Sequence, residues 1–345
     1  MVAIWHETGA MNFRISVSFW IFLLCWLVSC TKEAGEAKLK WKTELVRAIQ
    51  RDNVAEVQRI LSANSSSPAV ALNDNSLTPL MVAARAGSRE VTGWLLSQGV
   101  KVDAGTKAED GTALLGACDR GFLEIVKLLV EHGANVNHKD SRGWPPLLAA
   151  INQNHAAVAE YLIGKSADVN AGLSNKRSAL MSAAEGGNAS LVGLLLQKGA
   201  NINHTNDDGN DALIDAAAAG RAEVVSLLIK EGAQTDLQNE ARWTALSKAA
   251  ALGHCEAVKV LCDAGADPML PNKFGRTALE YARGITGTNN IATLGDVRAA
   301  ASNGLISREE TYYLLARKGS GRDFDCVVRV LEDYQRRFKR KPEAK

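Results

Sequence analysis

The sequence lacks the short motifs that carry catalytic or ligand chemistry. Its 345 residues contain no H-E-x-x-H, no G-x-S-x-G, no phosphate-binding G-x-x-x-x-G-K-[ST] and no Cys-x-x-Cys pair. An excess of charge is also missing, because 40 Lys and Arg stand against 38 Asp and Glu. A nearly neutral chain lacks the basic footprint of a nucleic-acid-binding protein. These absences argue against an enzyme, a cofactor, a metal site and a nucleic-acid partner.

A single long apolar run breaks this even composition, from Ile15 to Thr31. Arg14 precedes the run and Lys32 follows it, which gives the positive start and apolar centre of an export signal. Its large apolar side chains surround the axis, which argues against a core helix with one polar face. A retained membrane anchor is the alternative, although a span needs roughly 17 to 25 residues and this run is short. We expect the signal to be removed, and translation to start at Met11 and not at Met1.

The end of this run resembles the lipobox of bacterial lipoproteins. It reads Leu27-Val28-Ser29-Cys30, and the polar stretch TKEAGEAKLK follows. In that family the cysteine is lipidated and becomes the mature N-terminus, so the resemblance implies lipid on Cys30. Thr31 follows in place of an Asp. By the same resemblance, this implies the periplasmic side of the outer membrane.

A repeat of nearly constant period occupies the middle of the chain. A leucine recurs once after 34 residues and then every 33 residues, at Leu80, Leu114, Leu147, Leu180, Leu213, Leu246 and Leu279. A second marker, usually Gly-Ala, keeps the same phase at Gly99, Gly133, Ser166, Gly199, Gly232 and Gly265. Such arrays stack helical units, because no single unit can bury its own apolar face.

The pattern resembles the ankyrin repeat, which implies an all-α solenoid of helix-turn-helix repeats with β-turn fingers. It is clearest in GTALLGACDRGFLEIVKLLVEHGANVN, Gly111 to Asn137, and in NDALIDAAAAGRAEVVSLLIKEGAQTD, Asn210 to Asp236. About six full repeats are expected, at 73–105, 106–138, 139–171, 172–204, 205–237 and 238–270. The other expected parts are a signal peptide at 1–29, a lipidated tether at 30–41, an N-terminal capping repeat at 42–72 and an interrupted repeat at 271–345.

A polar side chain at one fixed position predicts the start of the first helix in most repeats. Its oxygen accepts a hydrogen bond from a free backbone amide, at Thr78, Thr112, Ser178, Asp211, Thr244 and Thr277. The third repeat has Pro145 and Pro146 instead, so its first helix is expected to lack the cap. Glycines such as Gly121 are expected in the left-handed turn between helices, and Asn154 takes that place in the third repeat.

The regular pattern stops after GRTALEYARG, since no apolar second helix follows where the period requires one. A helical stripe returns at DCVVRVLEDYQRRF, Asp325 to Phe338. We expect it to be the missing second helix, displaced by an insertion; an unrelated terminal helix is the alternative. In the first case Cys326 lies next to Cys255 or Cys262, and a bond from Cys255 to Cys326 would staple the insertion. Unpaired thiols are the alternative.

The resemblance implies protein binding through the fingers and the exposed ends of the first helices. The residue before the helix cap varies freely in the family, and here it includes two tryptophans and two arginines, which interfaces favour. The expected partner-binding residues are Arg142, Trp144, Asn152, Gln153, Asn175, Lys176, Arg177, Glu185, Asp207, Asp208, Asn210, Glu240, Trp243, Lys273, Phe274 and Arg276. For each tryptophan, packing against the neighbouring finger is the alternative. The mixed charge favours a protein surface over a polyanion.

Together these features predict a non-catalytic protein that is lipid-anchored in the bacterial envelope and binds another protein. The expected role is that of an inhibitor or immunity protein that covers a secreted antibacterial enzyme. A scaffold that stabilises a resident envelope enzyme is the alternative. An enzyme that uses the C-terminal insertion is the weakest interpretation.

Overall fold

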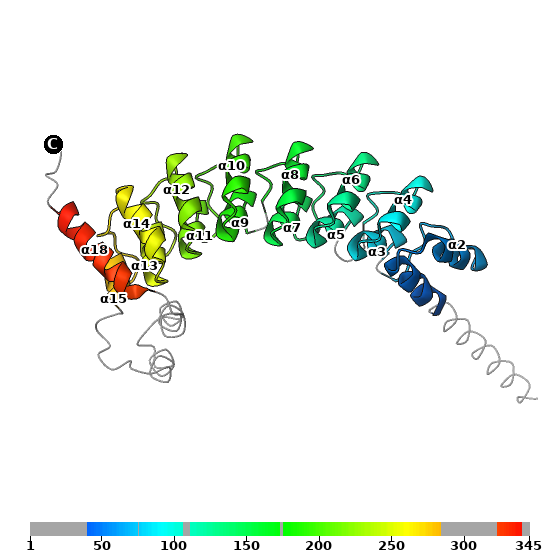
Figure 1. Ribbon diagram of the computed structural model, residues 1–345, viewed down its shortest axis with the longest axis horizontal. Coiled ribbons are helices and arrows are strands. Elements are labelled where there is room, and N and C mark those ends of the chain that lie inside the picture. The colour runs from blue at the N-terminus through cyan, green and yellow to red at the C-terminus, as the bar shows by residue number, and fades with distance from the viewer. Residues whose placement is uncertain (1–39, 75, 106–110, 173–174, 284–322, 340–345) are drawn as a thin grey trace, which may run out of the picture.

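The computed structural model describes residues 40–74, 76–105, 111–172, 175–283 and 323–339. Within these ranges the chain forms an arched row of helix pairs and contains no strand (Figure 1). The expected all-α class is therefore confirmed. The predicted signal, its Cys30 and most of the C-terminal insertion lie outside the described residues.

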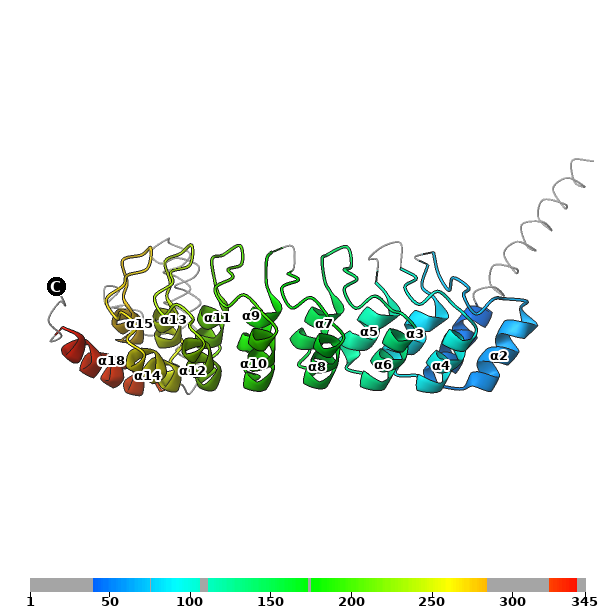
Figure 2. The ribbon, with the colours of Figure 1, turned by 90° about the horizontal axis from the view of Figure 1, so that it is seen from above.

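Each unit of the row contributes an inner and an outer helix. The inner helices are α3 (Pro79–Ala86), α5 (Ala113–Arg120), α7 (Pro146–Asn152), α9 (Ala179–Gly186), α11 (Ala212–Ala218), α13 (Ala245–Ala251) and α15 (Ala278–Arg283). The outer helices are α4 (Arg89–Ser97), α6 (Leu123–Glu131), α8 (Ala156–Gly164), α10 (Ala189–Gln197), α12 (Ala222–Lys230) and α14 (Cys255–Asp263). The inner helices line the concave side of the arch in Figure 1. Figure 2 shows the loops between units projecting side by side as fingers.

The inner helices begin as the sequence predicts, with one exception. A side-chain oxygen accepts from the backbone amide three residues on at Thr78, Thr112, Ser178, Asp211 and Thr244. Thr277 differs, because its hydroxyl and its amide both donate to the Glu280 carboxylate, at 3.0 and 2.7 Å. At α7 the expected loss of the cap is confirmed: Pro145 makes no side-chain bond, and burial of Pro146 through Ile151 holds the helix.

Left-handed residues turn the chain between the two helices of a unit. Gly121 has a φ of 74°, and a Cβ placed on it would lie 2.4 Å from Nδ1 of His155 in the next unit. Both the backbone conformation and this close approach therefore require glycine there. Asn154 takes the same role in the third repeat with a φ of 60°, as predicted.

The core lies between the inner and outer layers and runs continuously along the row. It joins Leu45 at one end to Tyr334 at the other through buried residues of every unit. Small residues such as Ala83 and Ala84 are fully buried, which lets neighbouring inner helices approach closely. Each apolar stripe is thus covered by adjacent units, and stability depends on nearest-neighbour contacts.

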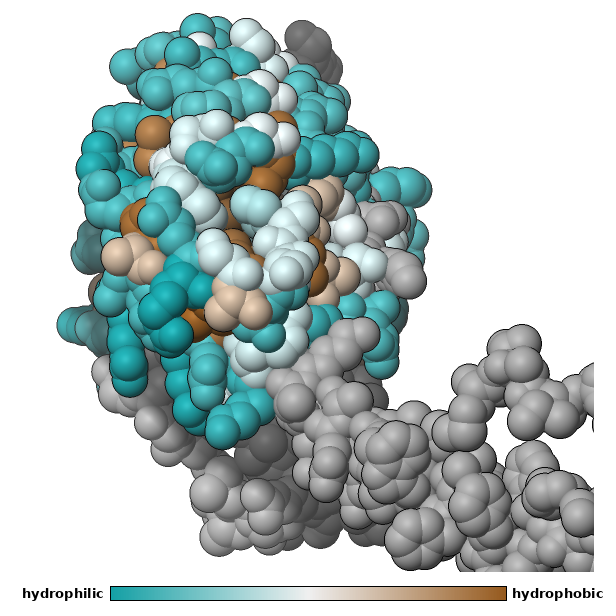
Figure 3. Space-filling view, turned by 90° about the vertical axis from the view of Figure 1, so that its right-hand side faces the viewer, coloured by the Kyte–Doolittle hydropathy of each residue, from teal (hydrophilic) through white to brown (hydrophobic). Residues whose placement is uncertain are grey.

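The N-terminal unit caps the row, as predicted. It consists of helical residues 40–50 and α2 (Val54–Ala63), and its end face is mostly hydrophilic in Figure 3. The Asp52 carboxylate accepts from the amides of Glu90 and Val91 at 3.1 and 2.8 Å. These amides begin α4, whose own N-cap residue Ser88 forms no side-chain cap. The Ser88 hydroxyl instead donates to the Ile49 carbonyl oxygen at 2.6 Å.

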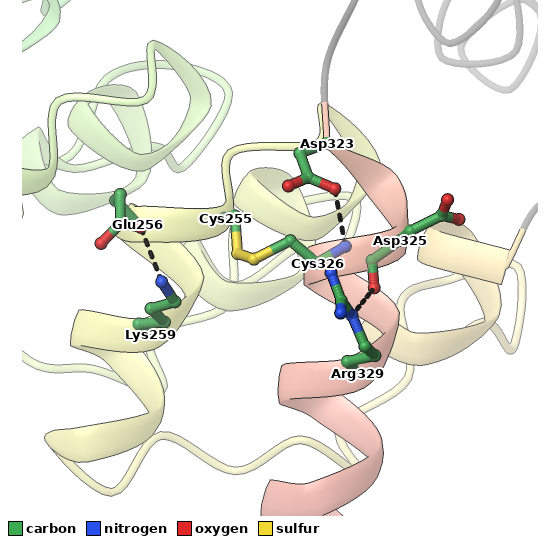
Figure 4. Close-up of a disulfide and its surroundings, with 7 residues drawn as sticks. All are labelled: Cys255, Glu256, Lys259, Asp323, Asp325, Cys326 and Arg329. Carbon is green, nitrogen blue, oxygen red and sulfur yellow. Dashed lines mark hydrogen bonds and ion pairs between the residues drawn. A yellow bond between two sulfur atoms is a disulfide. The ribbon is translucent and has the colours of Figure 1, made fainter.

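The other end of the row is closed by α18 (Phe324–Phe338), which packs against both α14 and α15 (Figure 1). Arg283 and Glu332 form an ion pair of 2.7 Å between α15 and α18. Cys255 and Cys326 are joined by a disulfide that spans 71 residues of sequence, with 5.9 Å between their Cα atoms (Figure 4). The predicted second helix and its staple are therefore both present.

The other cysteines of the described ranges, Cys118 and Cys262, are free and buried. Burial raises the pKa of the Cys262 thiol to about 12 and that of Cys118 still further. Both thiols are protonated at neutral pH, so they behave as small apolar core residues.

Candidate partner-binding surface

Five of the fingers are shaped by an Asn or Asp side chain that the sequence analysis missed. Its oxygen accepts from the backbone amide of the finger residue four positions later. These pairs are Asn73 with Leu77 at 3.0 Å, Asp140 with Trp144 at 2.8 Å, Asn206 with Asn210 at 3.0 Å, Asn239 with Trp243 at 2.8 Å and Asn272 with Arg276 at 3.1 Å. The recurrence of Asn or Asp at this phase of the repeat is the signal that predicts such turns.

Backbone hydrogen bonds join neighbouring fingertips in the second half of the row. Asp207 donates to Asn175 at 3.2 Å, Glu240 to Asp208 at 3.0 Å and Lys273 to Ala241 at 3.0 Å. The fingertips therefore form a fixed ledge. Their charged side chains stay in solvent: the Lys176–Asp207 pair is 3.2 Å long, with 67% and 52% of the side chains exposed. Such a pair contributes little to stability and leaves both groups open to a partner.

A groove of about 310 Å³ opens on the concave side across the first three repeats. Its apolar walls are formed by Leu77, Met81, Leu115 and the half-buried Trp144, and the small residues Gly116 and Ala149 also line it. Its polar rim consists of Arg85, Asp119, Asp140, Arg142 and Gln153. The structure thus places three expected binding residues, Arg142, Trp144 and Gln153, around one depression.

The rim beside Trp144 is fixed by the buried Asp140. Its carboxylate accepts from the Arg142 guanidinium at 3.1 and 3.2 Å and from the backbone amides of Arg142 and Trp144 at 3.0 and 2.8 Å. On the opposite rim, the Gln153 amide donates to Asp119 at 3.1 Å. The backbone that carries Trp144 is thereby fixed before any partner arrives.

A charged network centred on Arg177 occupies the middle of the concave face. The guanidinium lies 3.2 Å from the Asp215 carboxylate, donates to the Ser182 hydroxyl at 3.1 Å and pairs with Glu185. Only 21% of the Arg177 side chain is exposed. Burial raises the pKa of Asp215 to about 7, although Arg177 opposes the shift. Burial also raises the pKa of the neighbouring Asp211 to about 6.

Trp243 does not face solvent. It is 0% exposed, its ring centroid lies 4.5 Å from that of Tyr281, and the Lys248 ammonium lies 4.6 Å from it. The expected role of Trp243 as a partner-binding residue at the surface is therefore wrong. Its ring packs within the protein, against Tyr281 of the inner helix α15 and Lys248 of the inner helix α13.

The remaining expected residues are distributed along the ledge and the helix ends. The exposed ones are Asn152, Asn175, Lys176, Glu185, Asp207, Asp208, Glu240 and Lys273, and the half-buried ones are Asn210, Phe274 and Arg276. In the last described finger the Lys273 ammonium lies 5.3 Å from the Phe274 ring. The groove is also lined by Arg85, Asp119, Met81 and Leu115, which the sequence analysis did not select.

Two kinds of site are missing from the part of the chain that the structure describes. No cluster of three or more His, Cys, Asp or Glu side chains there is able to hold a metal ion. In the same ranges, every helix is too short or too polar to cross a membrane.

Comparison with protein families agrees with this architecture. Models described as ankyrin repeats match residues 75–107, 102–172, 168–239 and 228–282. The chain belongs to the ankyrin-repeat family. Ankyrin-repeat domains are typically non-catalytic modules that bind through an extended concave surface. In this ankyrin-repeat protein, the Trp144 groove lies on that surface.

Curated proteins resemble this ankyrin-repeat protein over short stretches. Protein phosphatase 1 regulatory subunit 12A of Mus musculus is 42% identical over 62 residues, which are 18% of this chain and 6% of that protein. Ankyrin repeat and KH domain-containing protein mask of Drosophila melanogaster is 39% identical over 51 residues, 15% of this chain and 1% of that protein. The chain thus spans a small part of these relatives.

Solved ankyrin-repeat domains resemble a larger part of the row. The human ASB11 ankyrin repeat domain is 29% identical with a TM-score of 0.55, and the match covers 59% of this chain and 91% of that domain. The ankyrin repeat domain of Bcl-3 is 27% identical with a TM-score of 0.51 and the same coverage. The shared part is the stacked repeat itself.

Proposed function

We propose that this ankyrin-repeat protein is held in the bacterial envelope by lipid on Cys30 and inhibits a secreted antibacterial enzyme by covering it. The observation that carries the binding role is the groove at Trp144. A half-buried tryptophan lies there between apolar walls and a fixed polar rim. Such anchors dominate the binding energy of protein interfaces.

The rigidity of the surface supports a binding role. Asn and Asp side chains fix the finger backbones, and hydrogen bonds between fingertips join them into a ledge. Groups that are already ordered lose little conformational entropy when a partner binds, so more of the contact energy appears as affinity. A stiff concave surface of this kind is suited to enclosing a protruding part of another protein.

The envelope location draws support from the disulfide. The bond between Cys255 and Cys326 ties the last two outer helices together. Structural disulfides persist in oxidising compartments, including the bacterial periplasm, and are rare in a reducing cytosol. This agrees with the export signal and lipobox that end at Cys30, whose lipidation rests on the sequence alone. Mass spectrometry of the mature N-terminus tests it: an unmodified Cys30, or an intact peptide across Ser29–Cys30, would contradict the anchor.

Inhibition is tested by isolating the partner and measuring its activity. The full chain and its Trp144→Ala variant are used to recover bound proteins from envelope fractions of the source. We expect Trp144→Ala to weaken the binding free energy of the specific partner by about 2 kcal/mol, because it removes the central anchor. An equimolar amount of the native chain should then abolish the activity of the purified partner. A partner whose activity is unchanged or increased would contradict inhibition and favour the scaffold.

A further inference from the structure

We propose that the groove at Trp144 takes a carboxylate side chain and a bulky apolar side chain from one extended segment of the partner protein. This inference rests on the proposed function, since it names the chemistry that the same surface recognises. Two features of the groove carry it: a cation without a counter-ion, and an apolar wall that faces solvent.

The cation is Arg85, at the end of α3. It is exposed, it lines the groove, and it forms no ion pair within the described residues. The other charged side chains of the groove each have a partner. Asp140 binds Arg142 at 3.1 Å, while Asp119 accepts from Gln153 at 3.1 Å and lies 3.8 Å from Arg120. Arg85 is therefore the charged side chain of the groove lining that has no ion-pair partner among the described residues, and a carboxylate of the partner complements it.

The place of Arg85 in the groove depends on Gly116 of the neighbouring inner helix. A Cβ at Gly116 would lie 2.5 Å from Cγ of Arg85 and 3.2 Å from its Cδ. The aliphatic stem of Arg85 thus lies directly over the glycine, in the space that a larger residue would occupy. Packed stems of this kind keep their charged head in solvent, where the guanidinium can bind a carboxylate with paired hydrogen bonds.

The apolar wall is formed by Trp144 with Leu77, Met81 and Leu115. The groove of about 310 Å³ that it encloses falls in the ordinary size range of ligand pockets. A bulky apolar side chain fills it by displacing water from the tryptophan ring. In an extended segment alternate side chains share a face. One such face therefore presents the carboxylate to Arg85 and the apolar group to Trp144.

Peptide selection on the full chain in detergent tests this chemistry. A random dodecapeptide library displayed on phage is selected on the native chain, and the strongest binder is synthesised. We expect enriched sequences to combine Asp or Glu with Leu, Phe or a similar residue. Arg85→Gln should lower the affinity for that peptide about tenfold, because it removes a charge-assisted hydrogen bond. The matched control is Arg89→Gln, an exposed arginine of the same repeat outside the groove, which should leave affinity unchanged.

A charge exchange separates recognition from a structural effect. Arg85→Glu should bind the original peptide weakly and regain affinity for a peptide whose acidic residue is replaced by Lys. Two outcomes would overturn the carboxylate recognition and leave the proposed binding function in place. In the first, peptides weakened by Trp144→Ala have no acidic residue. In the second, their affinity is unchanged by Arg85→Gln. If no peptide weakened by Trp144→Ala is recovered, the inference is overturned. A natural partner that binds folded Trp144→Ala at full strength would overturn the proposed function of the groove as well.

Discussion

Trp144 and Trp243 occupy the same position three repeats apart, yet one lines an open groove and the other is 0% exposed. The difference comes from the inner helices beside them. At the positions equivalent to Lys248 and Tyr281, the repeats beside Trp144 have the small residues Ala149 and Ser182. Trp243 instead packs on the ring of Tyr281 beneath the Lys248 ammonium. The position within the repeat fixes where the residue's backbone lies. The side chains of the neighbouring repeats determine whether its own side chain is buried or exposed to solvent.

The two halves of the concave face therefore use similar residues for different purposes. The N-terminal half keeps an apolar depression open, at a cost in exposed apolar surface that is typical of binding sites. The half toward the C-terminus fills the equivalent space and adds buried carboxyls at Asp211 and Asp215. We expect the N-terminal half to bind the partner and the half toward the C-terminus to contribute more to the stability of the fold.

The largest expected effect is on stability at the filled end. Trp243→Ala should lower the free energy of unfolding by about 3–5 kcal/mol, because it removes a fully buried aromatic side chain. Trp144→Ala should cost about 1 kcal/mol, because its side chain is only partly buried. Urea unfolding of both variants measures the difference. Equal losses would show that the two tryptophans are buried to the same extent in solution.

Removal of the disulfide should destabilise the C-terminal end alone. Cys255→Ala is expected to cost about 2–4 kcal/mol, since the bond closes a long loop in the unfolded chain. Hydrogen exchange should quicken in α14 and α18 and stay unchanged in α5 and α6. A reducing agent should add no further effect to Cys255→Ala. Uniform loss of protection along the row would contradict this local role.

Asp211 should make the filled half less stable as the pH rises. Burial raises the pKa of this carboxyl to about 6, so the folded state holds its proton more tightly than the unfolded state. Its favourable contribution is complete below about pH 4 and is lost as the pH rises through about 6. Burial raises the pKa of Asp215 to about 7, against the opposing effect of Arg177 and Lys248, so Asp215 should act in the same direction.

Asp211→Asn isolates this effect, because Asn keeps the oxygen that caps α11 and removes the charge. The variant should gain up to about 3 kcal/mol relative to the native chain at pH 8 and little at pH 4. Unfolding by urea at several pH values measures the gain. A gain that is the same at every pH would show that desolvation of the charge is not its cause.

The smallest expected effect on stability comes from the open half, where binding and stability should separate. Gly116→Ala places a methyl group where the Arg85 stem lies, so that side chain must move. Helix stability should rise by up to about 1 kcal/mol, because alanine replaces glycine inside a helix. Partner affinity should fall at the same time. A fall in both quantities would indicate a damaged fold, and unchanged affinity would remove Arg85 from the interface.

Much of the fold follows from short-range signals in the sequence. The 33-residue period, the polar caps such as Thr112 and the turn residue Asn154 each have a local mechanism, and the structure confirms them. The last repeat was also predictable, because the stripe after Asp325 has helical spacing and restores a missing element. That placement left Cys255 and Cys262 open as neighbours of Cys326, and unpaired thiols as the alternative; the structure shows the bond to Cys255.

The candidate surface was less predictable because its contacts join residues one or more repeats apart. Burial of Trp243 depends on Tyr281 in the next repeat. The Arg177–Asp215 pair likewise crosses from one unit to the next. Arg85 was missed because its importance depends on the absent side chain at Gly116. One signal was nevertheless visible. The residue two positions after the repeat leucine changes from Gly116 and Ala149 at the groove to Lys248 and Tyr281 beside Trp243.

The Asp52 carboxylate limits how far this chain can be shortened at its N-terminus and still fold. The repeat period places a boundary at residue 73, but the first outer helix receives its only described side-chain cap from Asp52, across that boundary. A shortened chain that begins at residue 73 would lose this acceptor and the cover over its first apolar stripe. At this end, the boundary of the sequence repeat is therefore not the boundary of a fragment that can fold alone. The smallest fragment that folds by itself includes both helices before residue 64.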